Sequence, residues 1–144
     1  LHVGIEHLDD NVLEYFKKAC RYKHIEKFCK LCDKYGISIL GYFIIGAPNE
    51  TEDYRKNLPK MIEDLNIKLP YFNLLAPLAE TPFYYELLRK KVFKNDHWKD
   101  FCANPKKSWM FPSHRTDHED SRLKGIMDGY VTHFKEQDML VFVT

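Results

Sequence analysis

Three short segments of the chain have the hydrophobic pattern of β-strands. Apolar residues alternate with small or polar ones in the first segment. The second is almost entirely apolar and rich in β-branched residues, as parallel strands covered on both faces are. Pro70 and Pro77 bracket the third. The predicted strands are residues 1–6, 37–46 and 71–76.

Between the strands, apolar residues recur at the three- and four-residue spacing of amphipathic helices. Asp9 and Asp10 fit the cap and first turn of the first helix, and Thr51 caps the helix that follows the second strand. Pro59 lies inside that helix and is expected to kink or restart it, because proline lacks a backbone N–H. The predicted helices are residues 11–19, 25–35, 51–65, 81–90 and 119–137, with residues 93–116 irregular.

This order of elements predicts an α/β fold with a parallel sheet, whose strands are joined by right-handed helical crossovers. Such sheets bind ligands beyond the carboxyl ends of their strands. The segments to inspect for a site are therefore Glu6 with His7, Gly46–Glu50 and Asn73–Pro77.

The amino-acid composition argues against two classes of binding partner. The 144 residues are 44% hydrophobic and 30% charged, with a net charge of +1 and no long run of one sign, so neither nucleic acid nor an anionic membrane is expected as a partner. No stretch approaches the roughly 20 apolar residues of a membrane span, and the expected location is cytoplasmic. Because the chain opens on Leu1 within an apolar segment, we expect it to be a piece of a longer protein.

The four cysteines follow no secreted disulfide framework and are expected to be reduced thiols. Cys29 and Cys32 fall on the apolar face of a helix, where buried thiols are a better interpretation than metal ligands. His114 and His118 have metal-pair spacing, but they fit an exposed helix entry better because no third ligand follows. No metal site and no catalytic residue is assigned.

Three longer segments carry recognisable motifs: VGIEHLDDNVLEYFKKA, CDKYGISILGYFIIGAPNETEDY and PYFNLLAPLAETPFYYEL. They resemble the radical S-adenosylmethionine (radical SAM) family. The first is similar to its G-I-E-S strand end and D-x-V-L helix, with Glu6 and Lys18 on the matching positions. The second resembles its aliphatic strand and P-G-E-T turn, and the third its sixth strand and P-x-x-G-T-P-L-Y run. Three changes depart from the pattern: His7 for Ser, Asn49 for Gly and Glu80 for Gly.

The resemblance implies that the carboxyl ends of the strands hold S-adenosylmethionine. A carboxylate at Glu6 suits its ribose hydroxyls or ammonium, and an ammonium at Lys18 suits its carboxylate. The backbone of Ile44 to Gly46 could pair with the adenine edge. A solvated strand end for Glu6, an ordinary surface lysine for Lys18 and a turn role for Asn73 remain alternatives. The implied cofactor-binding residues are Glu6, Lys18, Ile44, Ile45, Gly46 and Asn73.

The resemblance also implies a fold and a parent enzyme. Residues 1–92 are expected to form the second half of a TIM-like radical SAM barrel, with residues 93–144 as an irregular segment and a C-terminal helix packed on the same domain. The three-cysteine motif of the four-iron four-sulfur cluster is absent, so the chain alone should be inactive. The parent is expected to be an Fe-S oxidoreductase or transferase, nearest in pattern to cobalamin-domain and methylthiotransferase-like groups; whether cobalamin serves it stays open.

Half a barrel leaves an unpaired sheet edge. We expect this edge to meet the missing N-terminal half of the barrel, to mediate homo-oligomerisation, or to be covered by the irregular C-terminal segment. Two other classes of function remain alternatives: a non-catalytic α/β binding or interaction module, and another barrel enzyme with Glu6 as general acid or base and His7 as the nearby titratable group.

Overall fold

In the computed structural model, which describes residues 1–93, 95–105 and 112–143, the chain separates into two units. The first comprises residues 1–75 and 122–144, and the second residues 76–121. The expected division between residues 1–92 and 93–144 stays a prediction. All residues of the expected cofactor site belong to the first unit.

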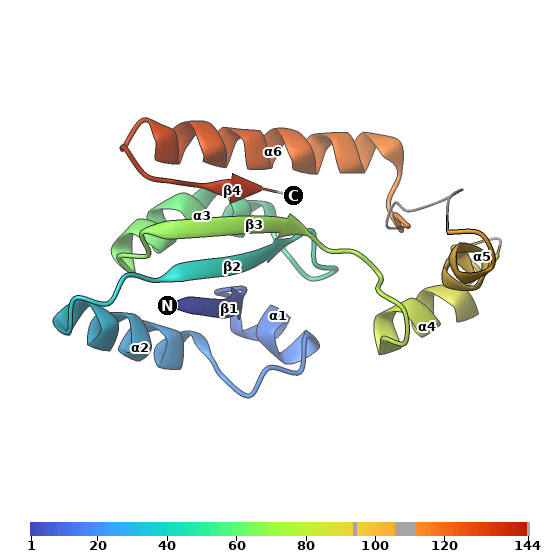
Figure 1. Cartoon of the computed structure of the whole chain (residues 1–144), viewed down its shortest axis with the longest axis horizontal. Coiled ribbons are helices and arrows are strands. Elements are labelled where there is room, and N and C mark those ends of the chain that lie inside the picture. Colours follow the sequence, from blue (N-terminus) through green and yellow to red (C-terminus); the bar gives the residue numbers. More distant parts are fainter. Residues whose placement is uncertain (94, 106–111, 144) are drawn as a thin grey trace. The chain divides into compact units, whose positions relative to one another are not determined.

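Four parallel strands form one sheet in the first unit (Figure 1). They are β1 (His2–Glu6), β2 (Leu40–Ile45), β3 (Leu69–Leu74) and β4 (Phe142–Val143), and they lie side by side in that order. The α/β class and the three predicted parallel strands are confirmed. The sequence analysis missed β4, which is only two residues long and offers no alternation to detect. Closure into a TIM-like barrel is not shown.

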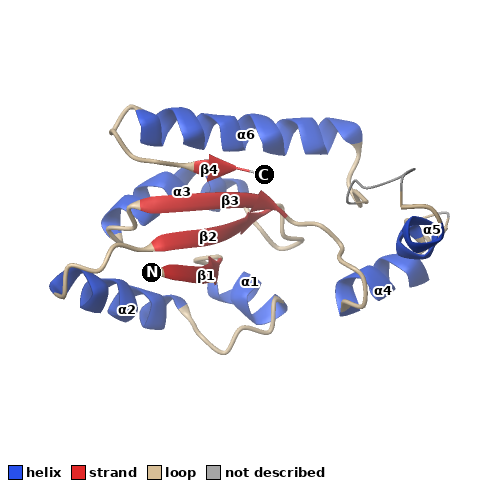
Figure 2. Cartoon of the chain, in the orientation of Figure 1, coloured by secondary structure: helices blue, strands red, loops and turns tan. Residues whose placement is uncertain are grey.

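Four helices cover one face of this sheet. They are α1 (Asp10–Tyr15), α2 (Tyr22–Lys34), α3 (Glu52–Asp64) and α6 (Asp117–Lys135), and Figure 2 shows α3 behind the strands. Their apolar faces join strand side chains such as Phe43, Ile45 and Phe72, all 0% exposed, in one core. None of the described helices is long and apolar enough to cross a membrane.

Helix α3 runs through Pro59 without ending there. The proline cannot donate to the carbonyl of Arg55, four residues earlier. The hydroxyl of Tyr130 on α6 donates to that carbonyl instead, at 2.7 Å. Burial raises the pKa of Tyr130, which keeps the hydroxyl protonated as a donor. A contact with another helix thus replaces the bond that the proline removes.

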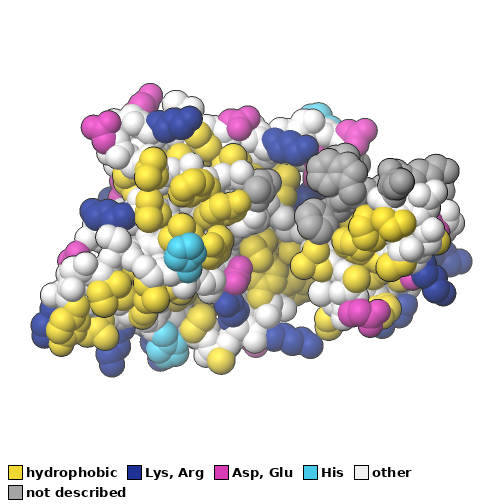
Figure 3. Space-filling model, viewed as in Figure 1, with side chains coloured by type: hydrophobic (Ala, Val, Ile, Leu, Met, Phe, Trp, Pro, Cys, Tyr) yellow, Lys and Arg dark blue, Asp and Glu magenta, His cyan; other side chains and the backbone are white. Residues whose placement is uncertain are grey.

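The opposite face of the sheet, called here the open face, keeps part of its surface exposed to solvent. Its residues alternate with the core residues along each strand, as the pleat requires. Figure 3 shows apolar side chains gathered over the strands on this face. The open face consists of His2, Gly4, Leu40, Tyr42, Ile44, Leu69, Tyr71, Asn73 and Phe142.

The second unit contains α4 (Pro82–Arg89) and α5 (His97–Ala103). The sequence analysis assigned α5 to an irregular segment, although Asp96 caps it by accepting from the N–H of Lys99 at 3.3 Å. The Tyr84 hydroxyl donates to Asp96 at 2.7 Å and so joins α4 to the start of α5. Other parts of the segment predicted to be irregular, Lys94 and residues 106–111, lie outside the described residues.

Replacing Phe72 by alanine should lower the free energy of unfolding by about 3–5 kcal/mol, because a cavity would open between the sheet and α6. Its ring lies 5.7, 5.0 and 6.1 Å from those of Phe43, Tyr130 and Phe134. Urea denaturation followed by circular dichroism would measure the loss. Leu31→Ala is the control: Leu31 is 52% exposed on α2, and its loss should cost less than about 0.5 kcal/mol. Equal effects would contradict the core described above.

Candidate functional site

A strained turn ends strand β1. The N–H of His7 donates to the carbonyl of Ile5 at 2.9 Å, and the residue between them, Glu6, has a φ of +68°. A three-residue turn with positive φ at its centre is rare and costly for a residue with a side chain. The pairing with β2 also shifts register between Gly4 and Glu6. Bulges and strained residues of this kind concentrate at functional sites, so the end of β1 is the first candidate.

The turn directs the Glu6 carboxylate back over Gly4. A Cβ atom on Gly4 would lie only 2.5 Å from Glu6 Oε1, so glycine leaves the space that the carboxylate occupies. The ammonium of Lys18 lies 3.4 Å from the same oxygen and donates to the Gly4 carbonyl at 2.9 Å. The Glu6 and Lys18 side chains are 25% and 33% exposed. The structure therefore brings together the two charged residues that the sequence analysis selected.

The other predicted residues lie at the ends of β2 and β3. Ile44 and Asn73 are register partners, both half-buried on the open face. Ile45 is 0% exposed and packs in the core, and its carbonyl accepts from the N–H of Leu75 at 2.8 Å. The N–H of Gly46 donates to the carboxylate of Glu50 at 3.1 Å. At Ile45 and Gly46, these backbone groups already have partners within the chain.

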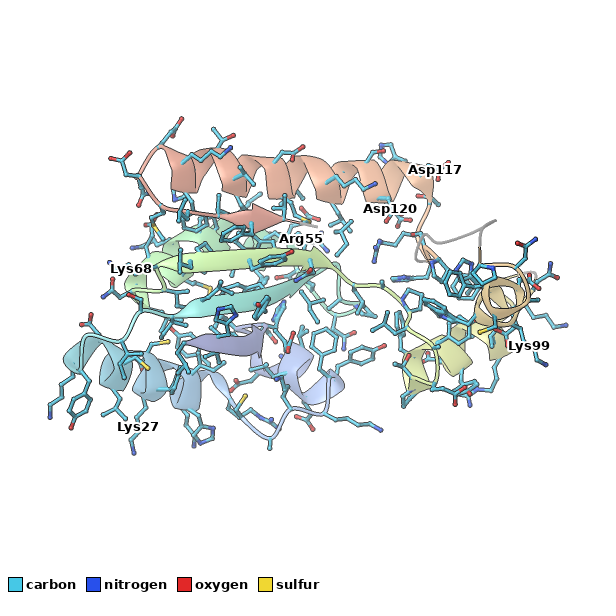
Figure 4. All side chains as sticks on the ribbon, viewed as in Figure 1. Lys27, Arg55, Lys68, Lys99, Asp117 and Asp120 are labelled. Atoms are coloured by element: carbon cyan, nitrogen blue, oxygen red, sulfur yellow. The ribbon has the colours of Figure 1, made fainter. Side chains whose placement is uncertain are left out.

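A buried polar cluster joins the loops after β1 and β2. The sequence marked both loops for inspection, as Glu6 with His7 and as Gly46–Glu50, but did not connect them. His7 and the Glu50 side chain are both 0% exposed, and Nε2 of the histidine lies 3.3 Å from Oε2 of the carboxylate. Arg55 of α3, labelled in Figure 4, binds Glu50 through Nε and Glu52 through Nη1 at 2.6 Å. The available signal was His7 in place of the family's serine, four residues before the predicted helix 11–19.

The hydrogen bonds of His7 indicate which of its ring nitrogens carries the proton. The backbone N–H of Asp9 donates to Nδ1 at 3.0 Å, so this nitrogen is an acceptor and the proton lies on Nε2, which faces Glu50. The ring also stacks on Tyr54 with centroids 3.8 Å apart. Both nitrogens are thus occupied. His7 is therefore not available at the strand ends as the second catalytic group of an acid–base enzyme.

Glu50 remains ionised despite its burial. Burial alone would raise the pKa of its carboxyl, but hydrogen bonds from His7, Arg55 and the Gly46 N–H outweigh this effect, and the pKa lies below its ordinary value. Hydrogen bonds to the charged form are the main compensation for placing a carboxylate inside a protein. Glu50 is therefore a fixed negative charge at the strand ends, and the Arg55 guanidinium balances it.

An aromatic row crosses the open face beside the charged pair. Tyr42, Tyr71 and Phe142 are register partners on three neighbouring strands, with ring centroids 5.2 and 5.6 Å apart. On β1 the partner of Tyr42 is Gly4, and the Glu6 and Lys18 groups lie over it. The face thus changes from charged to aromatic along one line across the sheet.

A groove of about 460 Å³ lies between α3 and α6, on the covered side of the sheet. Arg55, Pro59, Arg122 and Tyr130 are among its lining residues. None of the predicted cofactor residues lines it. We therefore place the candidate site at the strand ends, where the charged pair and the strained turn coincide.

Two of the four cysteines are buried, as expected from the apolar face of their helix. Cys29 and Cys32 are buried, free thiols in the core, and burial raises the pKa of Cys29 to about 11. Cys20 and Cys102 are also free. Within the described part of the chain, no group of three or more His, Cys, Asp and Glu residues could hold a metal ion.

Comparison with known proteins finds methyltransferases. The chain is 23% identical over 142 residues, 98% of its length, to an uncharacterized methyltransferase of Pyrococcus horikoshii. It is 30% identical over 88 residues, 60% of its length, to bacteriochlorophyllide d C-12(1)-methyltransferase of Chlorobaculum tepidum, and 24% identical over 103 residues, 69% of its length, to the C-8(2)-methyltransferase of that organism. It spans 30%, 19% and 23% of these relatives. No family model matches it.

These relatives correct the expected family and function. Their names specify methyl transfer, and none specifies radical chemistry, an iron-sulfur cluster or an oxidoreductase. They contradict the expectation of a radical SAM Fe-S oxidoreductase or transferase, and the expected cluster is not supported. The non-catalytic binding module is not supported either, because all three relatives are named as enzymes. The motifs located the strand ends but assigned them to the wrong chemistry.

Replacing Glu6 by glycine should raise the free energy of unfolding by about 1 kcal/mol, because glycine adopts positive φ without strain and the partly exposed ion pair contributes little. Lys17→Gly is the matched control, since Lys17 has a φ of +55° and is exposed. Urea denaturation should show a gain in both variants. A loss confined to Glu6→Gly would show that the turn is not strained.

The stability that Glu50 provides should depend on pH. Because its pKa is lowered by folding, its contribution is complete above the unfolded value of about 4.5 and is lost as pH falls through the folded value. The difference in free energy of unfolding between the wild type and Glu50→Gln should therefore shrink between pH 7 and pH 3. Urea denaturation at several pH values would measure it. A constant difference would contradict an ionised Glu50.

Proposed function

We propose that the chain is part of a methyltransferase that uses S-adenosylmethionine, and that the methyl donor binds at the carboxyl ends of β1, β2 and β3 on the open face. The observation that carries the proposal is the pairing of Glu6 and Lys18 over Gly4 at the end of β1. The names of the relatives support the reaction class. Parallel α/β sheets bind their ligands at this end.

The charges of the pair fit those of the donor. S-adenosylmethionine carries an ammonium and a carboxylate on its amino-acid part, and a carboxylate beside an ammonium is the complementary arrangement. Glu6 would accept hydrogen bonds from the ammonium or the ribose hydroxyls, and Lys18 would donate to the carboxylate. Both groups remain partly exposed and are therefore open to a ligand. When bound, the donor supplies a methyl group activated by its sulfonium.

The remaining predicted residues would contact the rest of the donor. Ile44 offers an apolar side chain and Asn73 an amide on the open face, on neighbouring strands. Ile45 would contribute only through its backbone, because its side chain packs in the core. Gly46 has a φ of +87° and no side chain, so it leaves the approach to the end of β2 unobstructed.

The sheet would continue in the whole protein. In the described residues no strand pairs with the outer side of β1, and the chain spans less than a third of each relative. We propose that further strands, as in a barrel, or a second copy of the chain pair with this edge. The pocket for the methyl acceptor would then include residues from outside this chain.

Titration of the chain with S-adenosylmethionine in a calorimeter tests the proposal. Glu6→Gln and Lys18→Met should each raise the Kd at least about tenfold, because each removes a charge-assisted hydrogen bond. Lys17→Met is the matched control and should leave the Kd within about twofold, since Lys17 is the exposed neighbour of Lys18. The proposal would be wrong if the wild-type chain showed no saturable binding or if all three variants bound equally.

A further inference from the structure

Two residues with positive φ end neighbouring strands of the sheet. Glu6 ends β1 with a φ of +68°, and Gly46 follows β2 with a φ of +87°. Glycine adopts this conformation freely, whereas a glutamate does so at a cost that the surrounding structure must offset. Other contacts must therefore hold Glu6 in this conformation.

Those contacts lead to the next residue. The backbone N–H of His7 closes the turn on Ile5. Its ring is fixed on three sides, by the N–H of Asp9 on Nδ1, by Glu50 at Nε2 and by the stacked ring of Tyr54. With His7 immobilised, the peptide after Glu6 cannot rotate to relax the positive φ.

Glu50 connects this anchor to the end of β2. The same carboxylate that faces His7 accepts from the N–H of Gly46 at 3.1 Å. Arg55, whose side chain is 13% exposed, binds Glu50 and ties the cluster to the start of α3. One buried carboxylate therefore bridges the two strand ends that flank the candidate site.

We infer that His7 and Glu50 are positioning residues: they hold the Glu6 turn and fix the spacing between the ends of β1 and β2. Neither side chain reaches the open face, because both are fully buried. They act through Glu6, whose carboxylate they keep over Gly4 beside Lys18. The consequence for the methyl donor rests on the proposed function, whereas the effect on the turn does not.

Amide hydrogen exchange, followed by NMR on the 144-residue chain, tests the effect on the turn. His7→Phe keeps a stacked ring but loses both nitrogen contacts, and should speed exchange of the residue 7 amide at least about tenfold. His7→Gln can still donate to Glu50 and should restore part of the protection. His133→Phe is the matched control, because it removes another histidine–glutamate pair, His133 with Glu63, which lies 2.5 Å apart between α6 and α3.

Exchange at residue 7 should stay within about twofold of the wild type in the control, after correction for global stability from denaturation. If His7→Phe also stays within that range, or if His133→Phe speeds exchange equally, the positioning role is overturned. If His7 contributed only to global stability, the corrected exchange rate at residue 7 would be the same in His7→Phe and His133→Phe.

Binding of S-adenosylmethionine separates this inference from the proposed function. If the wild-type chain binds it, His7→Phe should raise the Kd at least about tenfold and His133→Phe should not. If the wild-type chain does not bind it, the proposed function fails, and the exchange measurement still decides whether His7 holds the turn. Tight binding by His7→Phe would overturn the positioning role at the donor site.

Discussion

The geometry of the strand ends depends on the hydrogen bonds that the buried carboxylate of Glu50 accepts. An ionised carboxylate is costly to bury unless hydrogen bonds compensate it, and here His7, Arg55 and the Gly46 N–H do so. These partners come from three different segments of the chain. The requirement to satisfy one charge therefore fixes the loop after β1, the loop after β2 and the start of α3 relative to one another.

The same strands form both faces of the sheet, but the two faces differ in burial. On the covered face, Phe43 and Phe72 are completely buried among helices, and their packing stabilises the fold. On the open face, Tyr42 and Tyr71 form part of an aromatic row that retains exposed surface. The packing that stabilises the fold and the proposed ligand contacts thus lie on opposite sides of one sheet, so residues of the open face can change without a cavity forming in the core.

Two glutamates of this chain, Glu6 and Glu80, have a positive φ but differ in their contacts. Glu80, which the motif comparison marked as a departure from glycine, has a φ of +62° and keeps the conformation that glycine would adopt. Glu6 has a similar φ, and its side chain is engaged with Lys18 over Gly4, whereas the Glu80 carboxylate accepts from the Tyr85 hydroxyl. Positive φ alone does not distinguish a tolerated substitution from a turn at the candidate site. The distinction comes from the contacts of the side chain and of the residue that follows.

The sequence by itself determined the parallel α/β fold, its three longer strands and the selection of Glu6 and Lys18, because periodicity and motif spacing are local properties. It could not reveal the two-residue β4, whose only signal is its pairing with β3, nor the replacement of a lost helix bond at Pro59 by Tyr130. It also could not reveal the His7–Glu50 contact, which joins residues 43 positions apart. Only the tertiary structure decides which distant polar groups meet in the interior, because burial there makes every unpaired group costly.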